Sequence, residues 1–351
     1  MNLMVVHPGA SWATHDVHVG LVEGLKAHSV SICEWRLDGR MTMAHNWLHY
    51  LWRQQKRASQ ETAWQKPNQV DVIHHATTGI VERAIEKRIT DVLIVTAMFI
   101  PMDRIELMRR AGLRVWLICT ESPYQMEHEL ATAAACHGVW TNERASVPAF
   151  QAVQPKTAYF RHAWRVGVHD LPPVDEYASD VFFCGSMFPE RLKWFSEIDW
   201  SGIDFALYCR PEDLPKRSPL RQFLRGGVTP NQEMISLAKR SKIAINLFRA
   251  APVAAESLNP RCYELSAAGV CLVSDERAEW HEKFTGAPVV SSPAATSVLL
   301  RDLLNDAPRR HAIAAQQRAA VQSDTWLVRS RQIIDQLTEW QHMLQEGVSH
   351  A

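Results

Sequence analysis

The most restrictive feature of the sequence is a regular alternation of short, continuously apolar runs with amphipathic segments. Runs such as Leu3–His7, Asp91–Thr96 and Val115–Thr120 show no polar–apolar alternation, which predicts strands buried on both faces. Segments with helical spacing of apolar residues, such as Val17–His28, separate these runs. Because strands that alternate with helices in this way form a parallel sheet covered on both sides, the sequence predicts an α/β fold.

Two further apolar runs, Val30–Leu37 and Val70–His74, are predicted to be strands of the same sheet. In such sheets, ligands bind beyond the carboxyl ends of the strands. We therefore expect the loops after His7, His74 and Thr120 to line one wall of a ligand site.

The alternation of strand and helix occurs twice along the 351 residues, which exceed the usual size of one domain. Residues 167–179 break the rhythm with Pro172-Pro173 and several small and acidic residues, so we interpret them as a linker. In the second series, the loops after Cys184, Phe248 and Ser274 are expected to form the opposite wall of the site. The predicted organisation is an N-terminal Rossmann-like domain (1–166), the linker (167–179), a C-terminal Rossmann-like domain (180–325) and a terminal helix (326–351).

The net charge excludes few partners, whereas the spacing of the cysteines and histidines argues against a metal site. The 38 basic and 38 acidic side chains balance, so the net charge requires neither a nucleic-acid nor a membrane partner. Neither the seven cysteines nor the sixteen histidines show metal-binding spacing, and we predict that no metal is bound. The first residues do not resemble a secretion signal, and no apolar run approaches the roughly 20 residues that span a bilayer. We therefore expect a cytoplasmic protein.

A strand, a glycine turn and a helix start follow one another at Phe182–Arg191. Gly185 and Ser186 stand in the turn, and backbone N–H groups at a helix start favour a phosphate. Arg191 falls in the first turn of the helix, where the helix dipole disfavours a cation and a bound phosphate would remove the conflict. An ordinary strand-to-helix turn with a solvated arginine is the alternative interpretation.

The stretch Glu256–Gly269 contains two glutamates that flank seven residues. Pro260 suits the first turn of a helix, and Asn259 is then placed to cap it. Glu264 follows about one turn later, and the small residues after it allow a close approach by a ligand or a neighbouring helix. A capped helix with surface glutamates would explain the same pattern.

Together with its neighbours, this stretch resembles the donor-sugar motif of retaining family 4 glycosyltransferases. The variant Asn259-Pro-Arg-x-x-Glu264-Leu-x-Ala-x-Gly269 is similar to the CgeB-like (spore maturation protein) branch. The resemblance covers about residues 90 to 345, through the segments Thr120–Tyr124, Phe160–Ala163, Val181–Ser186 with Arg191, Lys242–Asn246, Cys271–Asp275 and Thr325–Arg329. It implies a GT-B fold, in which two doubly wound Rossmann-like domains face a cleft and the C-terminal helix returns to the first domain.

The resemblance also implies a nucleotide-sugar site in the C-terminal domain. Glu264 would hydrogen-bond the ribose of the donor, and Glu256 would contact hydroxyls of the transferred sugar. Asn259 and Arg261 complete this part of the donor set, with Arg261 as a second candidate for the diphosphate or for positioning the loop.

The diphosphate itself would be held by Arg191 and by the amides near Gly185 and Ser186. Arginine and helix N-termini stabilise such a leaving group without a metal, so the nucleotide sugar is a co-substrate and no cofactor is expected. The family usually has an arginine after the loop glycine and a lysine further on. Here Ser186 and Arg191 hold those places, so one cation is missing unless Arg261 replaces it.

The N-terminal domain is expected to bind the acceptor. His15 and Asp16 follow the first strand and are candidates to orient or deprotonate an acceptor hydroxyl, so we place them with Glu256 in the catalytic set. Asp16 is equally suited to cap the helix that begins at Val17. The other acceptor-side candidates are Trp12, His74, Glu121 and His162.

These features predict a glycosyltransferase that moves a sugar from a nucleotide sugar to a hydroxyl acceptor, and the resemblance implies retention of configuration. One candidate acceptor is a hydroxymethylated pyrimidine in phage DNA, since aromatic rings can stack bases and cations can hold phosphates. The residues that suggest it are Trp12, Trp47, Trp52, Trp64, Arg53, Lys56 and Arg57. The alternative interpretation of these tryptophans is that they pack helices.

The alternative acceptors are a glycan, a surface polymer or a small metabolite. The alternative function is that of a non-catalytic nucleotide-sugar-binding protein of the same fold.

Overall fold

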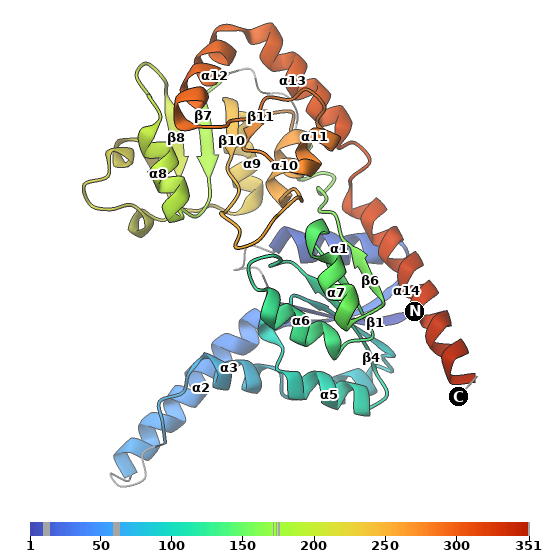
Figure 1. The fold of residues 1–351 in the computed structure, drawn as a ribbon. Coiled ribbons are helices and arrows are strands. Elements are labelled where there is room, and N and C mark those ends of the chain that lie inside the picture. The colour runs from blue at the N-terminus through green and yellow to red at the C-terminus, as the bar shows by residue number, and fades with distance from the viewer. Residues whose placement is uncertain (10–14, 59–63, 171, 173, 175, 350–351) are drawn as a thin grey trace. The chain divides into compact units, whose positions relative to one another are not determined.

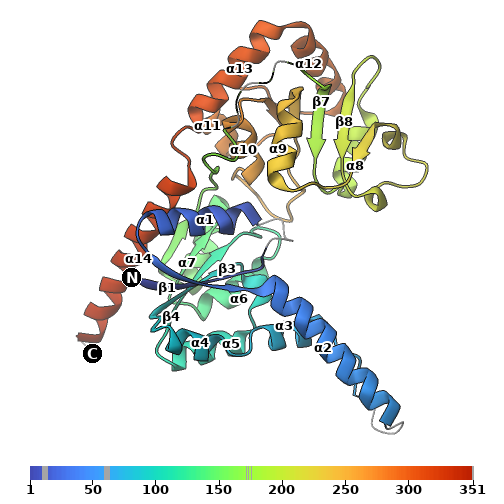
Figure 2. The same cartoon turned by 180° about the vertical axis from the view of Figure 1, so that it is seen from behind.

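The computed structural model describes residues 1–9, 15–58, 64–170, 172, 174 and 176–349. The chain forms two compact units, each an α/β arrangement around a parallel sheet (Figures 1 and 2). Unit 1 consists of Met1–Phe160 and Ser330–Ala351, and unit 2 consists of Arg161–Arg329.

Unit 1 contains a six-stranded parallel sheet in the order β2-β1-β3-β4-β5-β6. Its strands are β1 (Asn2–His7), β2 (Ser31–Arg36), β3 (Asp91–Val95), β4 (Arg114–Cys119), β5 (Gly138–Thr141) and β6 (Thr157–Tyr159). Its helices are α1 (His15–Ala27), α2 (Leu37–Ala58), α3 (Gln69–Ala76), α4 (Ile80–Glu86), α5 (Met102–Arg110), α6 (Met126–Ala134), α7 (Val147–Val153) and the 3-10 helices η1 (Ala97–Phe99) and η2 (Arg144–Ser146). All residues of the central strand β3 are buried, as its continuous apolar run predicts.

Unit 2 contains a five-stranded parallel sheet in the order β11-β10-β7-β8-β9. Its strands are β7 (Ser179–Cys184), β8 (Phe205–Tyr208), β9 (Leu224–Gly226), β10 (Ser241–Asn246) and β11 (Cys271–Ser274). Its helices are α8 (Pro189–Glu197), α9 (Asn231–Lys239), α10 (Pro260–Ala267), α11 (Ala278–Lys283), α12 (Pro293–Asn305), α13 (Ala307–Ala320) and the 3-10 helices η3 (Pro211–Asp213) and η4 (Pro219–Phe223).

Successive side chains of β7 enter two cores on opposite faces of the sheet. Val181 and Phe183 belong to the core that contains Phe195 of α8 and residues of α12. Phe182 belongs to the core that contains residues of α9 and α10. Burial on both faces explains why the sequence of this strand is continuously apolar.

The long C-terminal helix α14 (Trp326–Ser349) packs against unit 1 from residue 330 onward. The ring of Trp340 lies 5.9 Å from that of Trp116 and 4.6 Å from that of Trp140. Gly138 is required at this contact, because a Cβ there would be 2.7 Å from Cε3 of Trp340. The predicted return of the last helix to the first domain is therefore confirmed.

Residues 70–74 form part of helix α3, so the prediction of a strand there is wrong. Asn68 caps this helix, since its Oδ1 accepts hydrogen bonds from the amides of Val70 (2.8 Å) and Asp71 (3.2 Å). Asp71 completes a capping box by accepting from the Asn68 amide at 2.8 Å. Only Val72 and Ala76 are buried, at helical spacing, so a short apolar run here marks one stripe of a helix.

Helix α2 extends away from the sheet of unit 1, and α3 lies alongside it in both views (Figures 1 and 2). The two helices share a small core of Ala44, Val72 and Ala76. Among the described residues, none of the helices has both the length and the apolar content needed to cross a membrane.

Candidate functional site

The carboxyl ends of β7 and β10 lie next to each other in unit 2, because β10 pairs with β7 on the side opposite to β8. The chain runs outward from β7 to β9 and then returns to form β10 and β11 on the other side. Such a reversal is a topological switch point, where ligands bind in parallel sheets. The predicted donor residues lie on the segments that follow these two strands.

Arg191, in the first turn of α8, connects the loops that follow β7 and β10. Its Nε and Nη2 donate to the carbonyl of Leu247, at 2.9 and 2.5 Å, and its Nη1 donates to the carbonyl of Ser186 at 2.9 Å. The guanidinium also lies 5.1 Å from the ring of Phe188. These carbonyls offset the unfavourable position of a cation at a helix start, and through them Arg191 joins the two loops at the switch point.

The predicted phosphate loop uses some of its own amides. The amide of Gly185 donates to the carbonyl of Tyr208 at 3.0 Å, and the amide of Met187 donates to the carboxylate of Asp213 at 3.3 Å. A role for the loop amides in holding a diphosphate stays a prediction. Within this turn, the amide of Ser186 is the main candidate for that role.

Asn259 caps α10, as the sequence predicts, because its Oδ1 accepts from the amide of Cys262 at 3.3 Å. Its Nδ2 donates to Oδ1 of Asn246 at the end of β10 (2.8 Å). Asn246 in turn donates to the hydroxyl of Ser274 at the end of β11 (2.9 Å). One chain of side-chain hydrogen bonds thus ties the start of α10 to two strand ends.

Glu264 is held in a buried polar cluster on α10 and is only 3% exposed. Its Oε2 accepts from Nη1 of Arg261 at 3.0 Å, and its Oε1 accepts from Nδ2 of Asn231 at 3.1 Å. Arg261 also donates to Asn231, which contacts the ring of His169 at 3.1 Å. The arginine compensates the buried carboxylate, and Arg261 and Asn231 each fix one of its two oxygens. The sequence identified Glu264 and Arg261 but not Asn231 or His169, which no local spacing connects to them.

Glu256 lies on the loop before α10 and is partly buried. Its carbonyl accepts from the amide of Glu279 at 3.0 Å, and the carboxylate of Glu279 accepts from the amide of Leu258 at 2.8 Å. Glu279 is itself buried and pairs with Nε of Arg161 at 3.0 Å. Sequence reasoning missed this glutamate, which positions the backbone around residues 256–258.

Asp275 follows β11 and accepts a hydrogen bond from the amide of Phe248 at 2.8 Å. Burial raises the pKa of Asp275 to about 6, although this hydrogen bond and the charges of Arg277 and Arg191 lower it. A carboxyl that titrates near neutral pH beside a switch point is a candidate for proton transfer.

The catalytic candidates of unit 1 stand at the start of α1. The ring of His15 lies edge-on to His18 with centroids 5.3 Å apart, and His18 stacks on His7 at 4.1 Å. Burial lowers the pKa of His7, although Glu34, whose Oε2 is 3.4 Å from Nε2, opposes the shift. Helix α1 begins at His15, so Asp16 lies within its first turn, and the prediction that Asp16 caps this helix is wrong.

The other described acceptor-side candidates lie on separate elements. Trp12 lies outside the described residues. His74 is on α3 and not at a strand end, and its Nδ1 is 3.7 Å from Oδ2 of Asp103 on α5. His162 is buried in unit 2, where burial, and then the charge of Arg329, lowers its pKa to about 3.

Glu121 follows β4, and its position depends on a buried glutamate that the sequence did not reveal. The amide of Glu121 donates to Oε1 of Glu129 at 3.1 Å, and the hydroxyl of Ser122 donates to Oε2 at 2.5 Å. Burial raises the pKa of Glu129 to about 7, although both hydrogen bonds lower it. Across the part of the chain that the structure describes, no group of three or more His, Cys, Asp or Glu residues is arranged to hold a metal ion.

Comparison with known proteins gives a family match for unit 2 and architectural matches for the whole chain. Residues 191–335 match a family model described as glycosyl transferase-like. A search of curated protein sequences finds no match. HepE from Anabaena, solved in complex with UDP, has a TM-score of 0.61 and 10% identity over 97% of this chain and 100% of that chain. Trehalose-6-phosphate synthase from Burkholderia multivorans has a TM-score of 0.64 and 11% identity over 98% and 99% of the two chains.

The chain has the GT-B fold. This confirms the predicted fold class of two Rossmann-like units with parallel sheets. A trehalose-6-phosphate protein from E. coli, bound with UDP-2-fluoro glucose, is similar at a TM-score of 0.63 and 11% identity over 96% of this chain and 99% of that chain. The family match spans Arg191, Glu256 and Glu264 but leaves out nearly all of unit 1.

Proposed function

We propose that the protein is a glycosyltransferase that binds a nucleotide-sugar donor at the carboxyl edge of unit 2. The Glu264 cluster carries this proposal, because it presents a buried carboxylate with fixed oxygens at the switch point of a GT-B fold. The glycosyl transferase-like family match over residues 191–335 supports it. Two structures of similar fold contain UDP or UDP-2-fluoro glucose, which supports this class of donor.

In the proposed complex, Glu264 accepts hydrogen bonds from the vicinal hydroxyls of the ribose, since a carboxylate has enough acceptor positions for both. Arg261 makes both of its described contacts through Nη1. Its Nε and Nη2 make no hydrogen bond with any described residue, and the side chain is 30% exposed. We therefore propose that these N–H groups of Arg261 reach the diphosphate. In this complex, Arg191 fixes the loops that lie beneath the diphosphate.

In the proposed reaction, the bond from the anomeric carbon to the diphosphate breaks, and a bond to the acceptor oxygen forms. The acceptor proton passes to a base, and the nucleoside diphosphate leaves with the bonding electrons. Arginines that are already in place stabilise the charge that develops on the diphosphate. We propose retention, as the resemblance to family 4 implies. It is supported by a similar structure of trehalose-6-phosphate synthase described in terms of glycosyl transfer with retention.

A melting-temperature screen of UDP-, GDP-, ADP- and dTDP-sugars tests the donor proposal. We expect one class to raise the melting temperature of the wild type, because a ligand that binds only the folded state stabilises it. Glu264→Gln should abolish the shift. The matched control Glu197→Gln changes an exposed glutamate of α8 and should preserve it. The proposal fails if no nucleotide sugar binds, or if both variants bind as the wild type does.

For the acceptor, we propose a hydroxymethylated pyrimidine in DNA, and one face of α2 supports this candidate. Met43, Trp47 and Tyr50 recur at helical spacing and are 73%, 51% and 51% exposed, and the rings of Trp47 and Tyr50 stack at 5.8 Å. The exposed cations Arg53 and Arg57 continue this part of the helix. Stacked aromatic rings beside cations are the elements that hold unpaired bases and phosphates.

Binding of a fluorescent single-stranded oligonucleotide tests the acceptor proposal independently of the donor. We expect Arg53→Gln to weaken binding and reduce its salt dependence, and Trp47→Ala to weaken it roughly tenfold through lost stacking. The control Arg217→Gln removes an exposed cation of unit 2 and should bind as the wild type does. Equal affinity of all variants, or failure of hydroxymethylated DNA to accept labelled sugar, would leave a glycan or a small metabolite as the acceptor.

A further inference from the structure

Two further arginines lie at the carboxyl edge of the sheet of unit 2. Arg249 stands three residues after β10, and Arg277 stands three residues after β11, the strand that pairs with β10. Arg191 lies at the start of the helix that follows β7, on the other side of β10. Three cationic side chains are thus gathered at the carboxyl ends of three adjacent strands.

Aromatic rings position these guanidinium groups. The guanidinium carbon of Arg249 lies 4.8 Å from the ring centroid of Phe188, and that of Arg191 lies 5.1 Å from the same ring. The guanidinium carbon of Arg277 lies 4.5 Å from the ring centroid of Phe248, which is buried. A guanidinium that stacks on a ring keeps the N–H groups at its edge available to an anion.

Arg277 has hydrogen-bonding capacity left at this edge. Its Nη2 donates to the carbonyl of Arg249 at 3.4 Å. No ion pair joins its guanidinium to any residue that the structure describes. A cation of this kind beside two other arginines favours an anionic ligand.

The acidic side chains of the same loops have other partners. Asp275 accepts from a backbone amide at 2.8 Å and interacts electrostatically with Arg277. Oε1 of Glu190 accepts from a backbone amide at 2.8 Å, and Oε1 of Glu276 contacts a histidine ring at 3.2 Å. Within the described part of the chain, none of these three carboxyls forms an ion pair with Arg277.

Arg277 is also close in the chain to a contact with the loop that carries Glu256. The amide of Glu279, two residues after Arg277, donates to the carbonyl of Glu256 at 3.0 Å. The segment after β11 therefore packs against the loop whose glutamate is predicted to contact the transferred sugar. Arg249 shares the ring of Phe188 with Arg191, so the arginine pair adjoins both the diphosphate side and the sugar side of the proposed donor site.

We propose that Arg249 and Arg277 form a subsite for the carboxylate of an acidic sugar, so that the transferred sugar is a hexuronic acid. This inference rests on the proposed donor site, in which Arg261 and the amide of Ser186 already serve the diphosphate. A carboxylate at C6 accepts two parallel N–H donors from a guanidinium. The neutral hydroxymethyl group of an ordinary hexose leaves these donors without a charged partner, and such a mismatch lowers affinity.

Equilibrium binding of UDP-glucuronate and UDP-galacturonate to the full chain tests the subsite. Each is compared with its neutral counterpart, UDP-glucose or UDP-galactose, which differs only at C6, and with UDP alone. We expect the wild type to bind one acidic sugar nucleotide roughly tenfold more tightly than its counterpart, the gain from a charge-assisted hydrogen bond. Arg277→Gln should remove this preference, and it should change the affinity for UDP and for the neutral sugars by less than about twofold.

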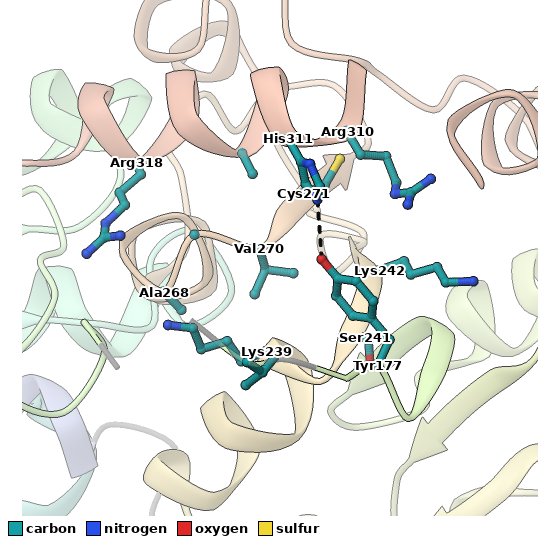
Figure 3. Close-up of a pocket in the computed structure, with 13 residues that line it drawn as sticks. Tyr177, Lys239, Ser241, Lys242, Ala268, Val270, Cys271, Arg310, His311 and Arg318 are labelled. Atoms are coloured by element: carbon teal, nitrogen blue, oxygen red, sulfur yellow. Dashed lines mark hydrogen bonds between the residues drawn. The ribbon is translucent and has the colours of Figure 1, made fainter. Parts of the chain in front are cut away.

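Arg318→Gln is the matched control, because it removes another arginine of unit 2. Arg318 lines a cavity of about 270 Å³ together with Ser241 and Cys271, the first residues of β10 and β11, so it lies at the amino ends of these strands (Figure 3). This variant should bind every nucleotide as the wild type does. Arg277→Lys keeps the charge without the paired N–H groups and should retain part of the preference.

The outcomes separate the subsite from the donor site. Equal affinity of the wild type for the acidic sugars and their neutral counterparts overturns the subsite and leaves the donor proposal standing. If Arg277→Gln weakens UDP and all four sugar nucleotides equally, the subsite is also overturned, and Arg277 then binds the diphosphate. If no UDP compound binds, or if Glu264→Gln binds all of them as the wild type does, the donor proposal fails and the acidic-sugar subsite fails with it.

Discussion

Two buried glutamates, one in each unit, are stabilised in different ways. Glu129 of unit 1 is 0% exposed and is held by the hydroxyl of Ser122 and the amide of Glu121. Glu264 of unit 2 is 3% exposed and is paired with the guanidinium of Arg261. Within the described part of the chain, a full positive charge lies within hydrogen-bond distance of Glu264 but not of Glu129.

The difference separates a structural carboxyl from one that we propose to bind a ligand. Burial without a cation raises the pKa of Glu129 to about 7, so this side chain gains a proton near neutral pH. Arg261 pairs with Glu264 at 3.0 Å, and a carboxylate accepts hydrogen bonds from sugar hydroxyls. The same residue type thus supports a loop in one unit and a proposed donor site in the other.

The largest expected effect comes from removing the cation in unit 2. Arg261→Met leaves Glu264 as a buried charge without its partner, which should lower the free energy of unfolding by about 3 kcal/mol at pH 7.5. This is the low end of the range for buried pairs, because Arg261 is 30% exposed and water can reach the pair. Urea denaturation measures the loss.

The double variant Arg261→Met/Glu264→Gln tests the cause. It removes the unpaired charge as well, so it should regain most of the lost stability while still failing to bind a nucleotide sugar. If Arg261→Met alone is as stable as the wild type, the pair does not stabilise the folded state, and the comparison fails at its first point.

The sequence predicted the architecture better than the site, and particular residues show why. Continuous apolar runs predicted strands such as β3 and β7, because burial on both faces of a parallel sheet removes polar residues along the whole strand. The run at residues 70–74 was misleading, since its helical identity depends on the cap at Asn68 and on packing against α2. Most side chains that hold Glu264, Glu256 and Glu121 in place come from other elements. Contacts between separate elements produce no recognisable spacing in the sequence.

An intermediate effect is expected at Glu129 and depends on pH. The pKa of this carboxyl rises from 4.5 to about 7 on folding, so its contribution to stability is complete below pH 4.5 and is lost as the pH rises through 7. Between pH 5 and pH 8 the wild type should lose on the order of 2 kcal/mol through this group. Glu129→Gln cannot ionise, so its urea midpoint should fall less over the same range.

Comparing the wild type with Glu129→Gln at each pH cancels the contributions of the other titrating groups to the pH dependence of stability. Asp275, whose pKa is also raised by burial, is one of these groups. Parallel pH dependence in the wild type and in Glu129→Gln would contradict the prediction and would mean that Glu129 stays ionised in the folded protein.

The smallest expected effect comes from Ser122, which adjusts Glu129 without removing it. Ser122→Ala deletes the hydrogen bond to Oε2 and should cost about 1 kcal/mol. That hydrogen bond lowers the pKa of Glu129, so its loss should also move the pH-dependent fall in stability to higher pH.

Thr141→Val is the matched control, because it removes the other hydroxyl contact of Ser122, at 3.1 Å, without touching the carboxyl. The control should lose stability equally at every pH. An unmoved pH profile in Ser122→Ala would show that desolvation alone sets the proton affinity of Glu129, and the hydroxyl would then be a packing contact.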